Sequence, residues 1–174
     1  AATADGGLNL ILTDDKLHTL TVVSETLVDL NAAALDNSLS VLDGSAANGG
    51  LLLDLSSATD ADEATAANQV ITVTTGSGND SIANFLGQVQ TSTITLGAGN
   101  DTFDMAASDF HTGHTLPTIT IDAGAGNDTI DLSDSTTLVT EGTISVTLGA
   151  GTDEIEVEGT ATSQTGVTVT DFTV

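Results

Sequence analysis

The chain contains Gly97-Ala98-Gly99-Asn100-Asp101, one of four similar phrases in its second half. The others are Gly76-Ser77-Gly78-Asn79-Asp80, Gly124-Ala125-Gly126-Asn127-Asp128 and Gly149-Ala150-Gly151-Thr152-Asp153. Each phrase follows a threonine-rich, β-branched run and precedes renewed apolar alternation, so each is predicted to be a turn between two strands. Alternate glycines allow positive φ, which would turn backbone carbonyls inward beside the aspartate. Carbonyl and carboxylate oxygens are the ligands that calcium prefers.

The spacing of the phrases predicts a repeating coil. Their first glycines are 21, 27 and 25 residues apart, which fits one coil of a β-solenoid. Alignment on these glycines gives two columns of strands. The first column contains residues 70–74, 93–96, 118–122 and 143–148, and the second contains residues 81–85, 102–105, 129–132 and 154–157. We therefore predict an all-β fold, a right-handed parallel β-solenoid with the glycine turns along one edge.

The alternation within each column predicts the direction of the side chains. Four apolar residues share one inward register position in each column: Val73, Ile94, Ile121 and Val146 in the first, and Ile82, Phe103, Ile130 and Ile155 in the second. The outward positions form a hydroxyl row (Thr72, Thr93, Thr120, Ser145) and an acid row (Asp29, Asp54, Asp104, Asp131, Glu156). A threonine row suits an exposed strand, whereas an acid row destabilises a sheet unless cations relieve the repulsion.

The first third of the chain continues both columns without clear glycine phrases. Residues 20–23, 39–42 and, near the C-terminus, 167–169 fit the first column, and residues 27–30 and 51–55 fit the second. Asp43-Gly44-Ser45 and Asn48-Gly49-Gly50 together resemble a degenerate turn. We predict one solenoid domain over residues 1–174, with degenerate coils in 1–69 and calcium turns in 70–174. It should hold about six coils, stacked about 4.8 Å apart. The irregular stretch 58–67 suits a helical turn.

Composition restricts the partners of the chain. Its 174 residues include 25 acids and the single base Lys16, which gives a formal net charge of −24. A compact fold at this charge density repels itself unless cations lie among the carboxylates. One lysine forms no basic patch, so nucleic acid and anionic membranes are disfavoured as partners. Because aromatic residues are few and cysteine is absent, we expect a thin aliphatic core in which metal replaces the disulfide as a staple.

The four phrases resemble the haemolysin-type calcium-binding repeats of RTX proteins, which read Gly-Gly-x-Gly-x-Asp-x-apolar-x. Residues 97–103 match the repeat from its second glycine onward, and the resemblance covers residues 70–158. The first glycine of the repeat is replaced by Thr75, Leu96, Ala123 and Leu148, and the last copy has Thr152 where the others have asparagine. In the family, calcium lies between successive turns of a parallel β-roll, bound by turn carbonyls and by the aspartate of each turn.

This resemblance implies a column of calcium along one edge. Carried over by position, the metal ligands are Gly76, Gly78, Asp80, Gly97, Gly99, Asp101, Gly124, Gly126, Asp128, Gly149, Gly151 and Asp153. Four stacked turns enclose three gaps, so the resemblance implies about three calcium ions. Tandem repeats of the family place glycine turns at both ends of each coil. This chain has them at one end only, so its calcium should line a single edge.

The amino-acid usage of the whole chain resembles that of the RTX-bearing S-layer proteins of Gram-negative bacteria, because long runs rich in Thr, Ala, Ser and Leu surround the widely spaced phrases. The resemblance implies a secreted, non-enzymatic structural protein of the cell surface, which folds and self-assembles into a lattice or filament when calcium is present. It implies no small-molecule substrate and no membrane insertion. Two alternatives stay open: a calcium-stabilised module of a secreted RTX adhesin, and the C-terminal β-roll of a secreted RTX enzyme.

Catalytic constellations are weak in this sequence. His111-Thr112-Gly113-His114 offers two imidazoles, but no third ligand stands at matching spacing, so a solvated loop is favoured over a transition-metal site. The serines have no partner histidine in a plausible triad order, and His18 stands alone. Acids are so frequent that no pair stands out as acid and base, and the aromatic platforms of a glycosidase are missing. We therefore expect no enzymatic activity.

Overall fold

The computed structural model describes residues 8–11, 17–31, 39–55, 70–85, 91–105, 118–133, 143–157 and 166–172. These residues form fourteen β-strands and no helix, and so none that could cross a membrane. Sheet A contains β1 (Leu8–Ile11), β3 (Val28–Asn31), β5 (Leu51–Asp54), β7 (Ser81–Phe85), β9 (Thr102–Met105), β11 (Thr129–Asp131) and β13 (Glu154–Glu156). Sheet B contains β2 (Thr19–Ser24), β4 (Val41–Ala47), β6 (Val70–Thr74), β8 (Thr91–Thr95), β10 (Thr118–Asp122), β12 (Thr143–Thr147) and β14 (Val167–Val169).

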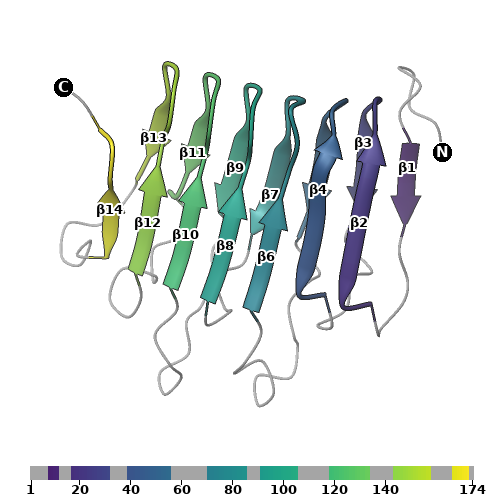
Figure 1. The fold of residues 1–174 in the computed structure, drawn as a ribbon. Helices are drawn as coiled ribbons and strands as arrows, with labels where there is room; N and C mark the ends of the chain where they lie inside the picture. The colour runs from purple at the N-terminus through teal and green to yellow at the C-terminus, as the bar shows by residue number, and fades with distance from the viewer. Residues whose placement is uncertain are drawn as a thin grey trace, which may run out of the picture.

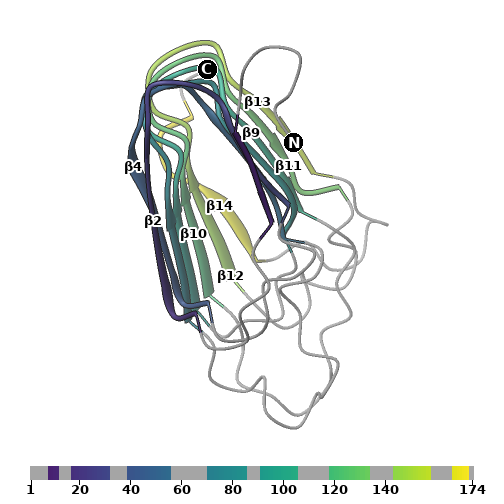
Figure 2. The same cartoon turned by 90° about the vertical axis from the view of Figure 1, so that its right-hand side faces the viewer.

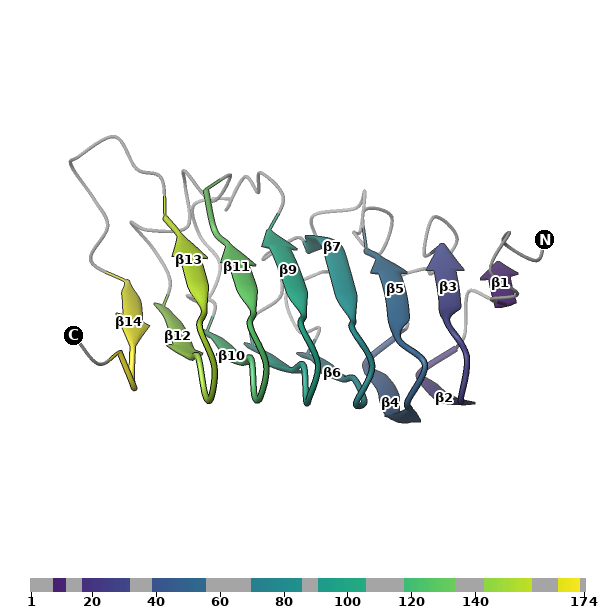
Figure 3. The ribbon, with the colours of Figure 1, turned by 90° about the horizontal axis from the view of Figure 1, so that it is seen from above.

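Successive strands alternate between the two sheets, and every pair within a sheet is parallel. The chain rises through sheet B, crosses a tight turn and descends through sheet A, advancing in a right-handed sense (Figures 1 and 2). Viewed from above, the strands stand in two facing rows (Figure 3). Six strand pairs, from β2–β3 to β12–β13, make complete coils, so the predicted parallel β-solenoid is confirmed.

The strand registers agree with the apolar alternation from β6 onward. Val73, Ile94, Ile121 and Val146 are neighbours across sheet B, and Ile82, Phe103, Ile130 and Ile155 are neighbours across sheet A. The hydroxyl row is also confirmed, because Thr72, Thr93, Thr120 and Ser145 pair in order and continue to Thr168. Period-2 alternation fixes such registers, since a one-residue slip would expose the whole apolar set.

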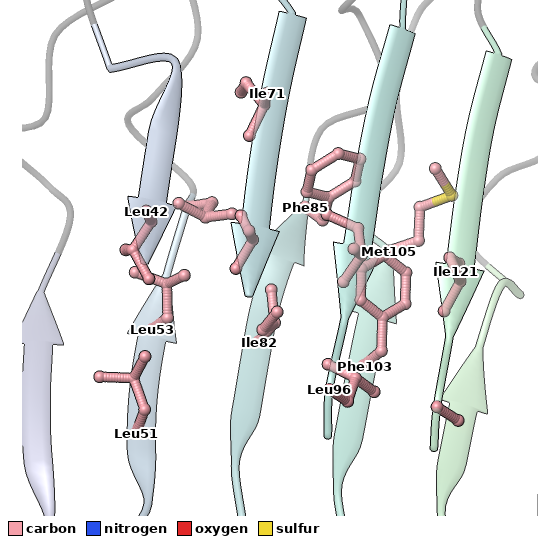
Figure 4. Packing of buried hydrophobic residues seen from close by; sticks show 14 of the residues in the cluster. Leu42, Leu51, Leu53, Ile71, Ile82, Phe85, Leu96, Phe103, Met105 and Ile121 are labelled. Atoms are coloured by element: carbon pink, nitrogen blue, oxygen red, sulfur yellow. The ribbon is translucent and has the colours of Figure 1, made fainter. Parts of the chain in front are cut away.

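The core is a thin layer of side chains between the two sheets. Leu, Ile and Val fill most of it, as the composition predicts. Among the described residues, aromatic side chains enter the core only near its middle, where the ring centroids of Phe85 and Phe103 lie 5.5 Å apart beside Met105 (Figure 4). Coil-on-coil stacking therefore buries every interior coil between two neighbours, whereas the end coils have one neighbour each within the described residues.

The prediction of a continuous acid row is wrong in the first coils. Asp29 is the neighbour of Leu52, and Asp54 lies between Asn31 and Ala83. The register shifts within β7, where Asn84 has a φ of 56° and donates its side-chain N–H to Asp54 at 3.0 Å. Only Asp104, Asp131 and Glu156 form an unbroken row. Breaking the row separates like charges, which relieves part of the repulsion that the sequence implied.

The interpretation of Asp43-Gly44-Ser45 as part of a turn is also wrong. Strand β4 continues through these residues to Ala47, and only Asn48–Gly49 form the turn. A Cβ on Gly44 would lie 3.1 Å from the carbonyl oxygen of Thr74, so this glycine permits close strand contact. Asp43 accepts hydrogen bonds from both the backbone N–H and the hydroxyl of Ser45, a local contact that mimics a turn signal. The helical turn predicted at 58–67, and His111 and His114, lie outside the described residues.

Candidate metal centre

The four glycine phrases stack at one edge of the solenoid, each beside the one before it along the solenoid axis. They form the tight turns between sheets B and A at the upper edge of Figure 1. Parallel bridges join Ala98 to Ala125 and Ala125 to Ala150 across successive turns. All twelve predicted ligand residues therefore lie on this single edge, which we call the turn edge.

Glycine is required in these turns by both conformation and space. Gly99 has a φ of 135° and Gly126 a φ of 144°, values that L side chains rarely adopt. A Cβ on Gly99 would lie 2.1 Å from the carbonyl oxygen of Gly78, and one on Gly126 would lie 1.6 Å from that of Gly99. The turns thus stack backbone on backbone with no room for a side chain between them.

The turn carbonyls point along the stack, which differs from the inward direction expected from the sequence. The carbonyl oxygens of Gly76, Gly97 and Gly124 accept N–H bonds from Ala98, Ala125 and Ala150 on the next coil, at 3.0, 2.9 and 2.8 Å. The carbonyl oxygens of Gly78, Gly99 and Gly126 face the following glycine of the stack. A carbonyl oxygen has two lone pairs, so each oxygen that accepts one bond keeps a second acceptor site.

The four predicted aspartates form one hydrogen-bonded column. We call Asp80, Asp101, Asp128 and Asp153 the aspartate column. Oδ1 of Asp101 accepts the backbone N–H of Asp80 at 2.8 Å, Oδ1 of Asp128 accepts that of Asp101 at 2.9 Å, and Oδ1 of Asp153 accepts that of Asp128 at 3.0 Å. Each carboxylate therefore reaches back to the preceding coil. The aspartate column therefore joins successive coils by hydrogen bonds, and it also places four acidic side chains in a row along the solenoid.

The first three carboxylates of the column are almost completely buried. The exposed fractions are 2 % for Asp80 and 1 % for Asp101 and Asp128, whereas Asp153 is partly exposed. Asp80 uses both oxygens, because Oδ1 accepts the N–H of Leu51 at 2.7 Å and Oδ2 accepts that of Gly76 at 3.2 Å. Oδ2 of Asp101 and Oδ2 of Asp128 are buried and have no hydrogen-bond partner. An unpartnered buried carboxylate oxygen is costly, because it has lost water and gained nothing in return.

Burial shifts the titration of these acids upward. It raises the pKa of Asp101 to about 7, the N–H bond from Asp80 opposes the rise, and the charges of Asp80 and Asp128 add to it. Burial also raises the pKa of Asp80 and of Asp128. Within the described residues there is no lysine or arginine to offset these charges. The column thus holds negative charge that a cation at this edge would stabilise.

Asn79, Asn100 and Asn127 form a second column of side chains, which we call the asparagine column, and its hydrogen bonds run in the opposite direction along the solenoid. Side-chain Oδ1 of Asn79 accepts the backbone N–H of Asn100, Oδ1 of Asn100 accepts that of Asn127, and Oδ1 of Asn127 accepts that of Thr152, each at 2.9 Å. Each asparagine side chain therefore accepts a backbone N–H from the next coil, whereas each aspartate side chain accepts one from the preceding coil. The sequence interpretation missed this role, although asparagine precedes aspartate in three of the four phrases.

The donor set fits calcium better than a transition metal. Within the described residues, no three His, Cys, Asp or Glu side chains converge on one point. Side chains alone therefore provide no complete coordination shell here. The buried oxygens without a hydrogen-bond partner at the turn edge are Oδ2 of Asp101 and Oδ2 of Asp128, and the same turns also contain backbone carbonyl oxygens. An all-oxygen set of carboxylates and carbonyls suits calcium, which tolerates irregular geometry.

Without a bound cation, the free energy of unfolding is expected to increase as the pH is lowered from about 8 to about 4. The pKa of Asp101 is about 7 in the folded chain, against an ordinary value of 3.8, so the folded state binds more protons between these values. This stabilisation is complete below the ordinary pKa and is lost as the pH rises through the folded pKa. Thermal unfolding followed by circular dichroism in calcium-free buffer measures the effect.

The control for this pH dependence is the double variant Asp101→Asn with Asp128→Asn, which cannot titrate at the two positions. Its stability should change much less over the same pH range. A wild-type stability that is flat, or that rises with pH, would contradict the burial of charge at the turn edge.

No protein-family model matches the chain, and no curated protein or solved structure matches it significantly.

Proposed function

We propose that the chain is a calcium-binding structural protein of the bacterial cell surface, which folds and self-assembles into an S-layer lattice in a calcium-dependent way. The observation that carries the proposal is the pair of buried, unpartnered carboxylate oxygens, Oδ2 of Asp101 and Oδ2 of Asp128, on neighbouring coils of the turn edge. Bound calcium would supply the positive charge that these oxygens lack. Asp101 and Asp128 would hold it together with carbonyls of the stacked turns.

Coupling between calcium and folding follows from the burial of these acids. The unfolded chain hydrates its carboxylates, whereas the folded chain dehydrates Asp80, Asp101 and Asp128 at a cost in free energy. The ligands meet only when the coils stack, so affinity for calcium adds to the stability of the fold. Calcium sites of extracellular modules bind at about 10⁻⁴ to 10⁻³ M. The chain would then stay unfolded at cytosolic calcium and fold outside the cell.

A structural role rests on the regularity of the molecule. Both sheets repeat from coil to coil, and the acids of the aspartate column follow this repeat, with one acid on each of four successive coils. The secreted, cell-surface location and the lattice come from the resemblance to RTX-bearing S-layer proteins.

Electron microscopy of the pure protein with and without calcium tests the proposed function. We expect ordered sheets or filaments in millimolar calcium and none in chelator. Magnesium at the same concentration is the matched control, because it demands near-ideal octahedral geometry and gives up its water reluctantly. Dispersed single particles under all conditions would contradict the lattice.

A further inference from the structure

The two ends of the solenoid are stepped, and the steps are complementary. At the N-terminal end, sheet A extends beyond sheet B by one strand, because β1 precedes β2 and pairs with β3. At the C-terminal end, sheet B extends beyond sheet A by one strand, because β14 follows β13 and pairs with β12. Figure 3 shows β1 projecting beyond β2 at one end and β14 projecting beyond β13 at the other.

Each end also presents open strand edges within the described residues. There, β1 and β13 have one neighbour each in sheet A, and β2 and β14 have one neighbour each in sheet B. The unpaired N–H and C=O groups of such edges are templates for a further parallel strand. Parallel pairing of one coil on the next is the contact that builds the rest of this molecule.

The apolar interior is incompletely covered at both ends. Within the part of the chain that the structure describes, the partly buried apolar residues that pack against the core belong to the two ends: Leu17 and Leu20 at one end, and Ile155, Val157, Val167 and Val169 at the other. Their counterparts in interior coils, such as Ile121 and Ile130, have an exposed fraction of 0 %. Phe172, at the C-terminal end, is 65 % exposed. Solenoids normally close their ends with polar caps, and no such cap covers these strand edges within the described residues, so the edges suit contact with a further coil.

We propose that copies of this chain stack head to tail, with the N-terminal end of one copy seated on the C-terminal end of another. In this arrangement β1 of the incoming copy pairs with β13, and its β2 pairs with β14. The two steps interlock, because β14 and the incoming β1 together complete one coil. The contact joins unlike surfaces without closing a ring, so it generates a filament. This proposal deepens the self-assembly in the proposed function and does not depend on calcium at the turn edge.

The register within sheet B predicts which residues meet. One row runs from Thr19 through Val41, Thr72, Thr93, Thr120 and Ser145 to Thr168. Continuing this row places Thr168 of one copy beside Thr19 of the next, and Val169 beside Leu20. These residues are uncharged, so the contact is free of direct charge repulsion in sheet B. The net charge of −24 on each copy still opposes association, which should therefore strengthen as added salt screens the charge.

Disulfide trapping tests this contact directly, because the natural chain has no cysteine. One sample carries Thr19→Cys and another carries Thr168→Cys, and both positions are exposed. Adjacent strands lie about 4.8 Å apart, which is within the Cα separation that a disulfide bridges. We expect the oxidised mixture to form a species of twice the 17.3 kDa chain mass, several-fold more abundantly than either variant alone. Thr120→Cys, exposed in the middle of the same row, replaces Thr168→Cys in the control mixture.

A second pair of variants tests whether association depends on the apolar residues at the C-terminal end or on the outward face of sheet B. Val169→Lys places a charge on the inward side of β14, and Thr168→Lys places the same charge on its outward side. Association is measured by sedimentation equilibrium in calcium, under conditions where circular dichroism shows that the chain is folded. The dissociation constant of Val169→Lys should be at least about tenfold higher than that of wild type, and a tenfold change corresponds to about 1.4 kcal/mol. Thr168→Lys should associate more strongly than Val169→Lys.

Two results would overturn the head-to-tail contact. One is a folded wild-type chain that stays monomeric at all protein and salt concentrations. The other is equal cross-linking of Thr19→Cys with Thr168→Cys and with Thr120→Cys. Neither result bears on calcium at the turn edge. Conversely, specific cross-linking of a chain whose β-structure persists in chelator would support the stacking and contradict the calcium proposal.

Discussion

Replacing Gly126 by alanine is expected to prevent folding of the chain or to destabilise it by about 4 kcal/mol or more. The φ of 144° at this residue is strained for any side chain, which costs about 1–3 kcal/mol. The new Cβ would also lie 1.6 Å from the carbonyl oxygen of Gly99, so the two stacked turns must separate. Separation would break the bond from the N–H of Gly99 to the carbonyl of Ala125, which is 2.8 Å long and joins the same two turns.

The size of this effect matters because single domains have only about 5–15 kcal/mol of stability. Ala125→Ser is the matched control, since Ala125 is exposed at the apex of the same turn. It should change the free energy of unfolding by no more than about 0.5 kcal/mol. Circular dichroism and thermal unfolding in calcium measure both variants. A Gly126→Ala chain with wild-type stability would show that the turns do not stack as closely as described.

The double variant Asp101→Asn with Asp128→Asn is expected to change stability in opposite directions with and without calcium. Asparagine keeps an oxygen that can accept the N–H of the preceding coil, but it carries no charge. In chelator the variant should be more stable than wild type, because two buried and unpaired negative charges are gone. In calcium the variant should need at least about tenfold more calcium to fold, because two carboxylate ligands are missing.

The opposite signs distinguish a metal site from a purely structural clamp. If the aspartate column served only as hydrogen-bond acceptors, the variant would lose or gain the same stability in both conditions. Asp122→Asn is the matched control, because this residue is exposed on β10 in the coil of Asp128 and its substitution removes one negative charge, as each substitution of the double variant does. It should leave the calcium midpoint nearly unchanged. A double variant with the wild-type calcium midpoint would exclude Asp101 and Asp128 as ligands.

The regular part of the fold could be predicted because two independent patterns agree there. The apolar alternation of residues such as Ile94 and Ile121 sets the register, and the glycine phrases mark where each coil turns. In the first third of the chain the glycine phrases are not clearly present, and residues of β4 were wrongly predicted to form part of a turn. Asp43 and Gly44 are turn-forming types, yet they lie within a strand where Gly44 admits the close approach of β6.

The composition of the turn edge could be predicted, but its hydrogen bonding could not. The repeat of the aspartate in each phrase was sufficient to place the aspartate column on one edge. That Oδ1 of Asp128 accepts the N–H of Asp101 depends on the stacking of separate coils, which no local pattern contains. For the same reason the asparagine column was missed, and the carbonyl of Gly97 was expected to point inward, whereas it accepts the N–H of Ala125 on the next coil.

A calcium titration of the whole chain, followed by far-ultraviolet circular dichroism from chelator to millimolar calcium, tests the proposed metal column most directly. The buried carboxylates of the aspartate column oppose folding while they are unpaired, so we expect little β-structure in chelator at pH 7.5 to 8 and a cooperative gain on adding calcium. A full β-spectrum in chelator that calcium leaves unchanged would contradict calcium-coupled folding.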